Sequence, residues 1–360
     1  MRMPGPLAVI AVCASVLLTG CRTYTPSFMP TFPPSPPSAL QLYRALRPEP
    51  LPYGVRGGLV AAITQPASGY LPGEGLLIPV WPTPAGPRDG LYLLNPASGR
   101  MSPLAPLLPS NREHVVTASA LGQGYFAYQA GPESGPRRAP LQLDTLAAHQ
   151  LTLAMPRGTA SAIYTSLAFA AGYLDFIATR SRGENDVTSA VSCALPKGPC
   201  RVLQSEHSSR TGLDVIALAP RGKRVYIALK PADPEDATQG MIAWVGQSGG
   251  KLHVLERTTG IPTSIVAGPD FLLFTEVVGI DDGLYVWRAH SLMRLTSPSE
   301  FPSDPSYGDG YVAWWGDSPG LLDLRTDQLY RVPGQQPVVH GDILTYLTPQ
   351  GLHWLRLPPP

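Results

Sequence analysis

A glycine-containing turn that runs directly into a short apolar stretch recurs seven times between residues 73 and 347. The first glycines of successive turns are 49, 50, 50, 46, 40 and 33 residues apart. Each apolar stretch has the usual length of a β-strand, and glycine permits the backbone conformations that tight turns need. A repeat of this kind restricts the chain to a small set of folds. The seven turns begin at Gly73, Gly122, Gly172, Gly222, Gly268, Gly308 and Gly341.

Further strands accompany each repeat. A strand, a turn and another strand follow most of the units, as in residues 91–100 and 242–252, and one more strand precedes several of them. Four-stranded antiparallel sheets that repeat about every 40–50 residues are typical of a β-propeller. The sequence therefore predicts an all-β propeller over residues 53–360, with seven four-stranded blades. Six or eight blades, or a β-sandwich, are the alternatives.

The two ends of the repeat region complement each other. The last unit ends with residues 351–357 and lacks a fourth strand, whereas residues 58–63 form a spare strand ahead of the first unit. Completing one blade with strands from both ends of the chain removes exposed sheet edges. We therefore expect the N-terminal strand to fill the vacancy in the seventh blade.

Composition agrees with this fold and limits the partners. The chain has 36 Gly and 42 Pro among 360 residues, and proline breaks helix interiors, so a mainly helical protein is excluded. The formal net charge is only +1. Nucleic-acid binders usually carry a basic excess or stripe, so we expect no nucleic-acid partner.

The N-terminus has the pattern of a targeting segment. Arg2 precedes an apolar stretch at residues 7–18, which is too short for a bilayer span of about 20 residues. The stretch ends in Leu18-Thr19-Gly20-Cys21, which resembles the lipobox of bacterial lipoproteins. The resemblance implies a signal peptide at 1–20 and lipidation of Cys21, and several acyl chains on one residue would hold the protein on a membrane. An ordinary signal peptide with a chance cysteine is the alternative.

The residue after this cysteine is Arg22, not the Asp associated with retention in the inner membrane. We therefore predict an extracytoplasmic protein, anchored in the outer membrane if the host has one. Residues 21–52 hold the lipidated cysteine and a stretch with nine prolines, which favours an extended tether that rises about 3.1 Å per residue. A ligand for a module with an aromatic groove is the alternative for this stretch.

Two cysteines remain in the mature chain. Cys193 and Cys200 flank a turn that contains Pro196, Gly198 and Pro199, so they can face each other across a hairpin. The extracytoplasmic compartment permits disulfides, and we predict one here. A metal pair is the alternative, but two cysteines without a nearby His or third Cys make a poor zinc site.

The repeated hairpins are similar to those of propeller lipoproteins and periplasmic propellers. The TolB type and the lipoprotein propeller of the outer-membrane β-barrel assembly machinery are examples. The resemblance covers architecture only, so it implies a fold and a cellular setting but assigns no functional residues.

Motifs for catalysis are sparse. Two Gly-x-Ser-x-Gly strings, at residues 246–250 and 316–320, lie between predicted strands, whereas a hydrolase elbow needs a helix after the serine. The seven histidines lack His-x-x-x-His spacing, and the acidic residues 233–236 and 281–282 lack calcium-loop spacing. Residues 281–283, Asp-Asp-Gly, are instead predicted to form a hairpin turn. We assign no catalytic or metal-binding residues and expect no cofactor. Of the adjacent Trp314 and Trp315, one should be core, and the other is a candidate to line a pocket, because neighbours on a strand face opposite sides.

The sequence thus favours a non-catalytic binding or scaffold propeller that binds a protein partner in the envelope. The long segments 131–140, 181–188 and 231–239 are predicted to be recognition loops. The alternative is a propeller enzyme, such as a hydrolase, lactonase or sugar dehydrogenase. Its site would gather groups from several blades at the central funnel and would not be visible as a linear motif.

Overall fold

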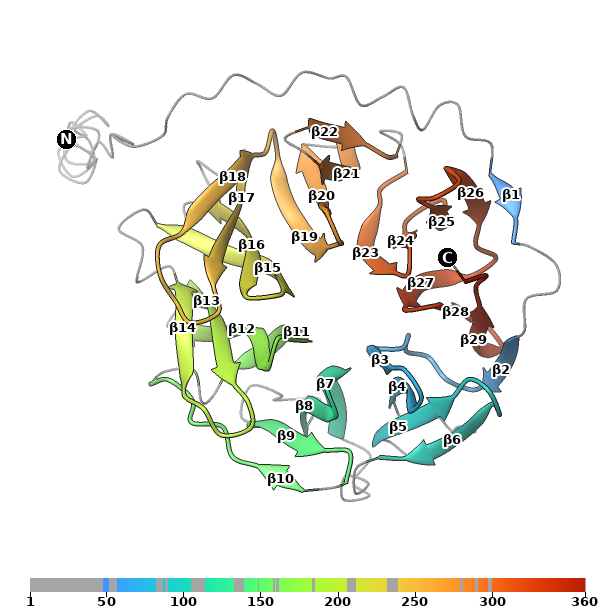
Figure 1. Ribbon diagram of the computed structural model, residues 1–360, viewed down its shortest axis with the longest axis horizontal. Helices are drawn as coiled ribbons and strands as arrows, with labels where there is room; N and C mark the ends of the chain where they lie inside the picture. The colour runs from blue at the N-terminus through green and yellow to red at the C-terminus, as the bar shows by residue number, and fades with distance from the viewer. Residues whose placement is uncertain are drawn as a thin grey trace, which may run out of the picture. The chain divides into compact units, whose positions relative to one another are not determined.

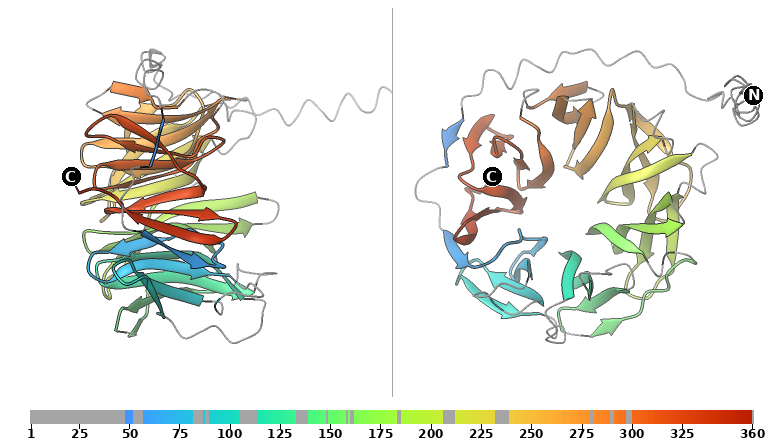
Figure 2. Two further views of the ribbon diagram at one scale, coloured as in Figure 1. Left: turned by 90° about the vertical axis from the view of Figure 1, so that its right-hand side faces the viewer. Right: turned by 180° about the vertical axis from the view of Figure 1, so that it is seen from behind.

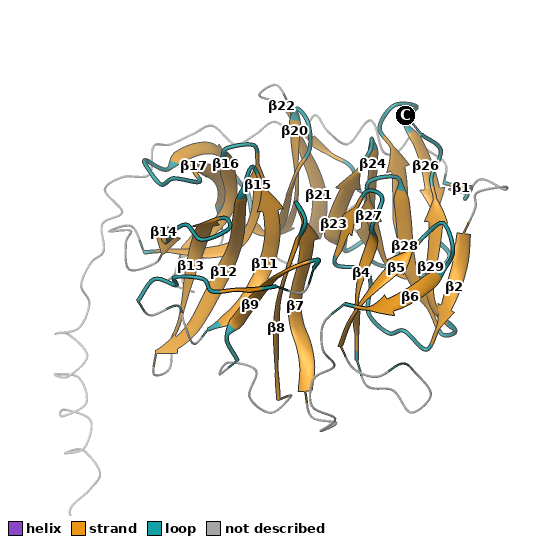
Figure 3. Ribbon diagram, turned by 60° about the horizontal axis from the view of Figure 1, so that its bottom comes forward, coloured by secondary structure: helices purple, strands orange, loops and turns teal. Residues whose placement is uncertain are grey.

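A computed structural model of the chain consists of β-strands and loops, and its described residues form no helix (Figure 3). Accordingly, the described part of the chain holds no helix long and apolar enough to cross a membrane. The described residues are 48–51, 57–81, 87, 90–104, 114–132, 139–147, 149–157, 159, 162–182, 185–205, 212–231, 239–278, 281–288, 291–296 and 300–359. The predicted signal peptide, Cys21 and most of the predicted tether lie outside these residues.

Seven sheets are arranged in a ring, which confirms the predicted seven-bladed β-propeller (Figure 1). In blades 1–6 the chain builds each sheet from the centre outward. Blade 1 consists of β3 (Gly69–Leu71), β4 (Gly75–Val80), β5 (Gly90–Asn95) and β6 (Arg100–Pro103). Blade 2 consists of β7 (His114–Gly122), β8 (Tyr125–Pro132), β9 (Leu141–Thr145) and β10 (Gln150–Leu151). Blade 3 consists of β11 (Ile163–Ala170), β12 (Tyr173–Arg182), β13 (Asn185–Ala194) and β14 (Cys200–Ser205).

The remaining blades follow the same order. Blade 4 consists of β15 (Leu213–Arg221), β16 (Arg224–Pro231), β17 (Met241–Gly246) and β18 (His253–Arg257). Blade 5 consists of β19 (Ile261–Ala267), β20 (Phe271–Val278), β21 (Asp281–Arg288) and β22 (Ser291–Arg294). Blade 6 contains β23 (Ser303–Gly308), β24 (Tyr311–Trp315), β25 (Gly320–Asp323) and β26 (Gln328–Arg331). Blade 7 contains β27 (Gln335–His340), β28 (Ile343–Thr348) and β29 (Gly351–Arg356).

An N-terminal strand completes blade 7, as predicted. The strand β2 (Gly57–Ala61) pairs antiparallel with β29, with Leu59 opposite His353, and supplies the fourth, outermost strand. The residue after β29 stays attached to blade 7, because the Leu357 N–H donates to the Asp342 carbonyl oxygen at 2.7 Å. The Tyr311 hydroxyl donates to the Pro358 carbonyl oxygen at 3.2 Å. Both β2 and the described C-terminal residues are therefore held by blades 6 and 7.

The end of the predicted tether forms one strand that the sequence did not predict. The short strand β1 (Glu49–Pro50) pairs parallel with β26, with Glu49 opposite Tyr330 and Pro50 opposite Arg331. The next residue, Leu51, packs against the apolar cluster between blades 6 and 7. Proline fits on such an edge because it lacks an N–H to donate.

The hydrophobic core is divided among the seven junctions between blades. Each apolar cluster joins residues of two neighbouring blades, as where Leu143 of blade 2 packs with Phe176 of blade 3. Polar side chains add further links across the junctions. The Val339 N–H of blade 7 donates to Ser306 Oγ of blade 6 at 2.9 Å, and His340 Nε2 donates to the Ala67 carbonyl oxygen at 3.3 Å. These contacts fix each blade against the next.

The antiparallel topology gives the ring two different faces (Figure 2). One side of the ring carries the turns between the first and second strands and between the third and fourth strands of each blade, and we call it the turn face. We call crossing face the side with the connections from one blade to the next and between second and third strands. In six blades a register irregularity interrupts the innermost strand, which lines the centre of the ring.

Two local predictions were wrong. Residues 181–188 are not a long loop, because β12 and β13 remain paired as far as Arg182 and Asn185. Residues 281–282 are not a turn but the first residues of β21, with Asp281 opposite Val278. In both cases polar residues at strand ends have the composition of a turn while their backbones pair across a hairpin. Of the other predicted recognition loops, residues 133–138 and 232–238 lie outside the described residues.

Candidate functional site

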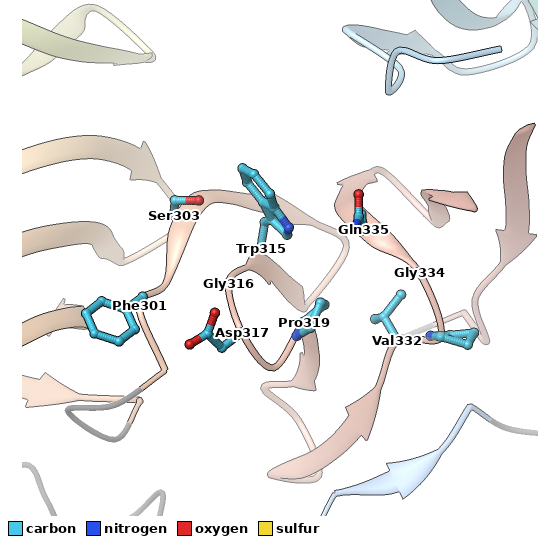
Figure 4. A pocket seen from close by; sticks show the side chains of 10 residues that line it. Phe301, Ser303, Trp315, Gly316, Asp317, Pro319, Val332, Gly334 and Gln335 are labelled. Atoms are coloured by element: carbon cyan, nitrogen blue, oxygen red, sulfur yellow. The ribbon is translucent and has the colours of Figure 1, made fainter. Parts of the chain in front are cut away.

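A cleft with a volume of about 650 Å³ lies on the crossing face between blades 6 and 7 (Figure 4). We call it the 6/7 cleft. Its walls come from three connections that are distant in the sequence: the one that enters β23, the one between β24 and β25, and the one between β26 and β27. The lining residues are Phe301, Ser303, Trp315, Gly316, Asp317, Pro319, Val332, Pro333, Gly334 and Gln335.

The adjacent tryptophans at the end of β24 have different environments, as predicted. Trp314 is fully buried in the cluster between blades 5 and 6, whereas Trp315 lines the 6/7 cleft. Neighbouring residues of a strand project to opposite faces of its sheet, so one faces the core and the other is half exposed. The rigid blade therefore supports an aromatic side chain in the cleft.

Backbone contacts hold the cleft walls together. The Asp317 N–H donates to the Glu300 carbonyl oxygen at 3.1 Å, and the Val332 N–H donates to the Pro319 carbonyl oxygen at 3.1 Å. Gly316 has a positive φ of 158°, and a Cβ there would lie 2.5 Å from the Glu300 carbonyl oxygen. A larger residue would push these two connections apart, so the glycine is required for the close approach.

Left-handed backbone conformations cluster around this cleft. Phe301, Asp304 and Gln336 have φ values of 42°, 45° and 48°, which are uncommon for residues other than glycine. Asp304 and Gln336 lie within the register irregularities of β23 and β27. Such strain costs on the order of 1–3 kcal/mol per residue and is found disproportionately at functional sites.

The chemical character of the cleft is aromatic and anionic. Phe301 is 45% exposed, and Phe301 and Pro319 lie on either side of Asp317, with the indole of Trp315 nearby (Figure 4). Asp317 is exposed and carries the charge of the lining. Among the described residues that line the cleft there is no lysine or arginine. An aromatic face beside a carboxylate suits a cationic group, through cation–π attraction and charge pairing.

A second cleft of about 510 Å³ adjoins the first on the same face, between blades 7 and 1. The segment Pro333, Gly334 and Gln335 lines both clefts. The second cleft is otherwise lined by Ala62, Ile63, Thr64, Leu347, Thr348, Pro349 and Gly351, without a charged side chain among these residues. Together they form an extended surface that is acidic at one end and uncharged at the other.

The buried carboxylates lie elsewhere and do not converge. Burial raises the pKa of Asp175 to about 6, and Gln247 Nε2 donates to its Oδ2 at 2.8 Å at the junction of blades 3 and 4. Burial also raises the pKa of Glu276, which accepts hydrogen bonds from the Thr259 hydroxyl and the Gly260 N–H. Each group thus lies at a separate junction. No group of three His, Cys, Asp or Glu able to hold a metal occurs in the described part of the chain.

Both Gly-x-Ser-x-Gly strings form connections between antiparallel strands, as the sequence indicated. Ser248 lies between β17 and β18 on the turn face, and Ser318 lies between β24 and β25 beside the 6/7 cleft. The histidines are dispersed: His253 stacks on Trp244, and His353 stacks on Tyr346. His207, His290 and the acidic residues 233–236 lie outside the described residues.

The predicted cysteine pair is confirmed, because Cys193 and Cys200 form a disulfide across the β13–β14 hairpin. Cys193 is fully buried in the cluster between blades 2 and 3. Sequence reasoning did not find Phe301 or Gln335 as cleft residues. The adjacent tryptophans indicated one wall of the cleft. No motif or spacing in the sequence indicated the residues of the other two walls.

Comparisons with known proteins agree on the fold. No protein-family model matches the sequence, and no curated protein matches it significantly. An oligogalacturonate lyase in complex with manganese superposes with a TM-score of 0.58 and 12% identity, covering 87% of this chain and 98% of that one. The β-propeller domain of the trilobed protease from Pyrococcus furiosus, which has an open velcro topology, has a TM-score of 0.50 and 7% identity, covering 72% and 78%.

A puromycin-hydrolyzing peptidase of Mycobacterium tuberculosis superposes with a TM-score of 0.55 and 17% identity, covering 74% of this chain. The chain spans 43% of that peptidase and 45% of a prolyl endopeptidase that it also resembles. At these identities the likeness shows the propeller fold alone. Unlike a propeller with open velcro topology, this chain has β2 and β29 paired in blade 7.

Proposed function

We propose that this protein is a bacterial lipoprotein whose propeller acts as a non-catalytic binding or scaffold module in the cell envelope. The observation that carries the proposal is the 6/7 cleft, where Trp315, Phe301 and Asp317 form an open aromatic and anionic surface on the crossing face. Partner recognition commonly concentrates on exposed aromatic side chains that a rigid scaffold holds in place.

The cellular setting rests on the N-terminal sequence. The apolar stretch, the lipobox-like Leu18-Thr19-Gly20-Cys21 and the Pro-rich residues that follow support a lipid anchor and a tether. The disulfide between Cys193 and Cys200 fits an extracytoplasmic location, because disulfides persist in oxidising compartments.

The lining of the cleft supports a protein partner that presents a lysine or arginine side chain. Such a side chain can place its charge beside Asp317 and its face or stem against Trp315 and Phe301. The adjoining uncharged cleft between blades 7 and 1 offers room for flanking residues of the same segment. Phe301, Asp304 and Gln336 hold strained conformations around this surface, which is consistent with a site under functional constraint.

Site-specific crosslinking in intact envelopes tests the binding role. A photoreactive residue in place of the exposed Gln335 should capture a discrete partner, whereas one at the exposed Asp327 on the turn face should not. Adding Trp315→Ala or Asp317→Asn to the Gln335 variant should abolish capture. Equal capture at Asp327 would contradict the cleft as the binding surface.

The alternative of a propeller enzyme makes a different prediction at the same cleft. An enzyme would turn over a substrate, and Asp317→Asn would abolish turnover rather than only binding. Detection of such turnover by the purified protein would replace the scaffold proposal.

The anchor is tested separately. Cys21→Ala should leave an unprocessed precursor without acyl chains, whereas the wild-type protein should carry acyl chains on a mature N-terminal Cys21. Mass spectrometry distinguishes the two, and a wild-type mature N-terminus without lipid would refute the lipoprotein assignment.

A further inference from the structure

Six basic side chains gather on the turn face of blades 3 and 4. We call them the basic turn patch. They come from three turns and the strand ends beside them, and five are exposed while Arg221 is half-buried. The six residues are Lys197, Arg201, Arg221, Lys223, Arg224 and Lys251.

Hydrogen bonds between the turns make the patch one continuous surface. Arg201 Nη1 of blade 3 donates to the Ser248 carbonyl oxygen in the β17–β18 turn of blade 4 at 2.9 Å. The Gln247 N–H of that turn donates to the Lys223 carbonyl oxygen in the β15–β16 turn at 3.1 Å. The outer and inner turns are thereby held side by side, with Lys251 in one and Lys223 in the other.

The positive charge of this patch is not neutralised within the described part of the chain. None of its six side chains forms an ion pair with a described residue, whereas on other blades Asp270 pairs with Arg288 and Asp342 with Arg356. The acid that contacts these turns, Asp175, is fully buried beneath them and hydrogen-bonded to Gln247. A protein with nearly equal numbers of acidic and basic residues thus concentrates positive charge on one part of one face.

Apolar side chains accompany the charges. Val202 and Val254, at the turn-face ends of the outermost strands of blades 3 and 4, are 39% and 45% exposed. The Arg224 guanidinium lies 4.4 Å from the centre of the Trp244 ring, which is half-buried. Basic residues combined with exposed apolar and aromatic side chains are typical of surfaces that adsorb to anionic membranes.

The short strand β1 has a defined direction relative to the two faces. β26 runs from the turn face to the crossing face, and β1 is parallel to it, with Glu49 opposite Tyr330 and Pro50 opposite Arg331. Within β1, Glu49 therefore lies nearer the turn face and Pro50 nearer the crossing face.

We infer that the basic turn patch is a docking surface for the anionic lipid headgroups of the membrane to which the protein is anchored. This inference rests on the proposed lipid anchor for its cellular meaning, but the surface itself can be measured without the anchor. Contact through this patch would orient the propeller with its turn face toward the bilayer and its 6/7 cleft away from it, accessible to a partner.

A vesicle-binding experiment tests the inference with a chain that begins at Arg22. Every described contact lies within residues 48–359, so this chain keeps all of them. It should co-sediment with vesicles of phosphatidylcholine and phosphatidylglycerol in equal parts but not with phosphatidylcholine alone, and binding should decrease as salt is added. The triple variant Lys197→Gln, Lys223→Gln and Lys251→Gln should bind on the order of 100-fold more weakly.

Two matched variants keep the experiment decisive. The first is a triple variant that removes the same number of positive charges near the crossing face and should leave vesicle binding unchanged. It carries Arg180→Gln, Lys230→Gln and Arg331→Gln. Replacing the three patch lysines by arginine should preserve vesicle binding. Thermal unfolding of each variant checks that the fold is retained, and the arginine variant keeps the test valid if the glutamine variant is unstable.

The outcomes separate the patch from the anchor. Equal weakening by both triple glutamine variants, or no binding to anionic vesicles at all, would overturn the inference. The inference would also be overturned if the chain bound inorganic phosphate or duplex DNA saturably but did not bind vesicles. Vesicle binding by the patch together with a wild-type protein that lacks lipid on Cys21 would refute the anchor and leave the patch standing.

Discussion

The side-chain amide of Gln247 in blade 4 donates from Nε2 to Oδ2 of the buried Asp175 in blade 3, at 2.8 Å. The same nitrogen donates to the Ala170 carbonyl oxygen at 3.1 Å, so one side chain joins two blades at the turn face. Burial nevertheless has the largest effect on this carboxyl group, and it raises the pKa of Asp175 from 3.8 to about 6. The junction therefore gains a hydrogen bond while holding a group that is costly to ionise.

The first prediction concerns pH. The folded protein retains the Asp175 proton to higher pH than the unfolded chain does, so it binds more protons between about pH 4 and about pH 6. The free energy of unfolding should thus fall as pH rises through this window, by at most on the order of 3 kcal/mol. Asp175→Asn should remove that loss and stabilise the protein at neutral pH. Urea unfolding of both proteins across this range measures the effect.

A control variant isolates this group from others. Burial lowers the pKa of His340, which acts in the opposite direction, because stability is then lost as pH falls. The difference between wild type and Asp175→Asn cancels that contribution. The exposed Asp327→Asn should leave the pH profile unchanged, and a matching change there would contradict the role of Asp175.

The second prediction concerns ring closure. Deleting residues through Arg47 removes no described contact, and deleting through Leu51 removes β1 and one partly buried leucine. Deleting through Ile63 also removes all of β2 and the Ile63 side chain, which is only 2% exposed. This deletion exposes the edge of β29 and should lower the free energy of unfolding by several kcal/mol. Thermal unfolding should show a small decrease for the second deletion and a large one for the third. Equal melting temperatures would refute the closure.

Periodic features made most of this architecture predictable. Seven glycine turns, a spare N-terminal strand and a missing C-terminal one predicted the blades and their closure, because each is a local pattern repeated along the chain. The pairing of Cys193 with Cys200 and the divergence of Trp314 from Trp315 followed from hairpin and strand geometry in the same way.

Features that depend on contacts between distant segments were not predictable. The 6/7 cleft needs Phe301, Trp315 and Gln335 from three connections, and the basic turn patch draws on three turns of two blades. The strand β1 pairs with β26 next to the blade junction against which Leu51 packs, and composition reveals neither contact. A Pro-rich segment was expected to be only a tether, yet its last residues join a sheet.

The third prediction concerns the disulfide. Cys193 and Cys200 close a short loop, so the stabilisation from constraining the unfolded chain should be near the low end of about 2–4 kcal/mol. Replacing both cysteines with alanine should lower the unfolding free energy by about that amount. Reductant should destabilise the wild type similarly and leave the double variant unaffected. A double variant that still responds to reductant would show that another cysteine pair contributes.

The fourth prediction uses the two adjacent tryptophans of β24 as a matched pair. Trp314 is fully buried between blades 5 and 6, so Trp314→Ala should leave a cavity and cost about 3–5 kcal/mol of stability. Trp315 lines the 6/7 cleft, so Trp315→Ala should change stability by less than about 1 kcal/mol and instead abolish partner capture. Chemical unfolding and crosslinking through position 335 measure the two effects. If Trp315→Ala destabilises the fold as much as Trp314→Ala does, its side chain serves the core and the cleft loses its main recognition element.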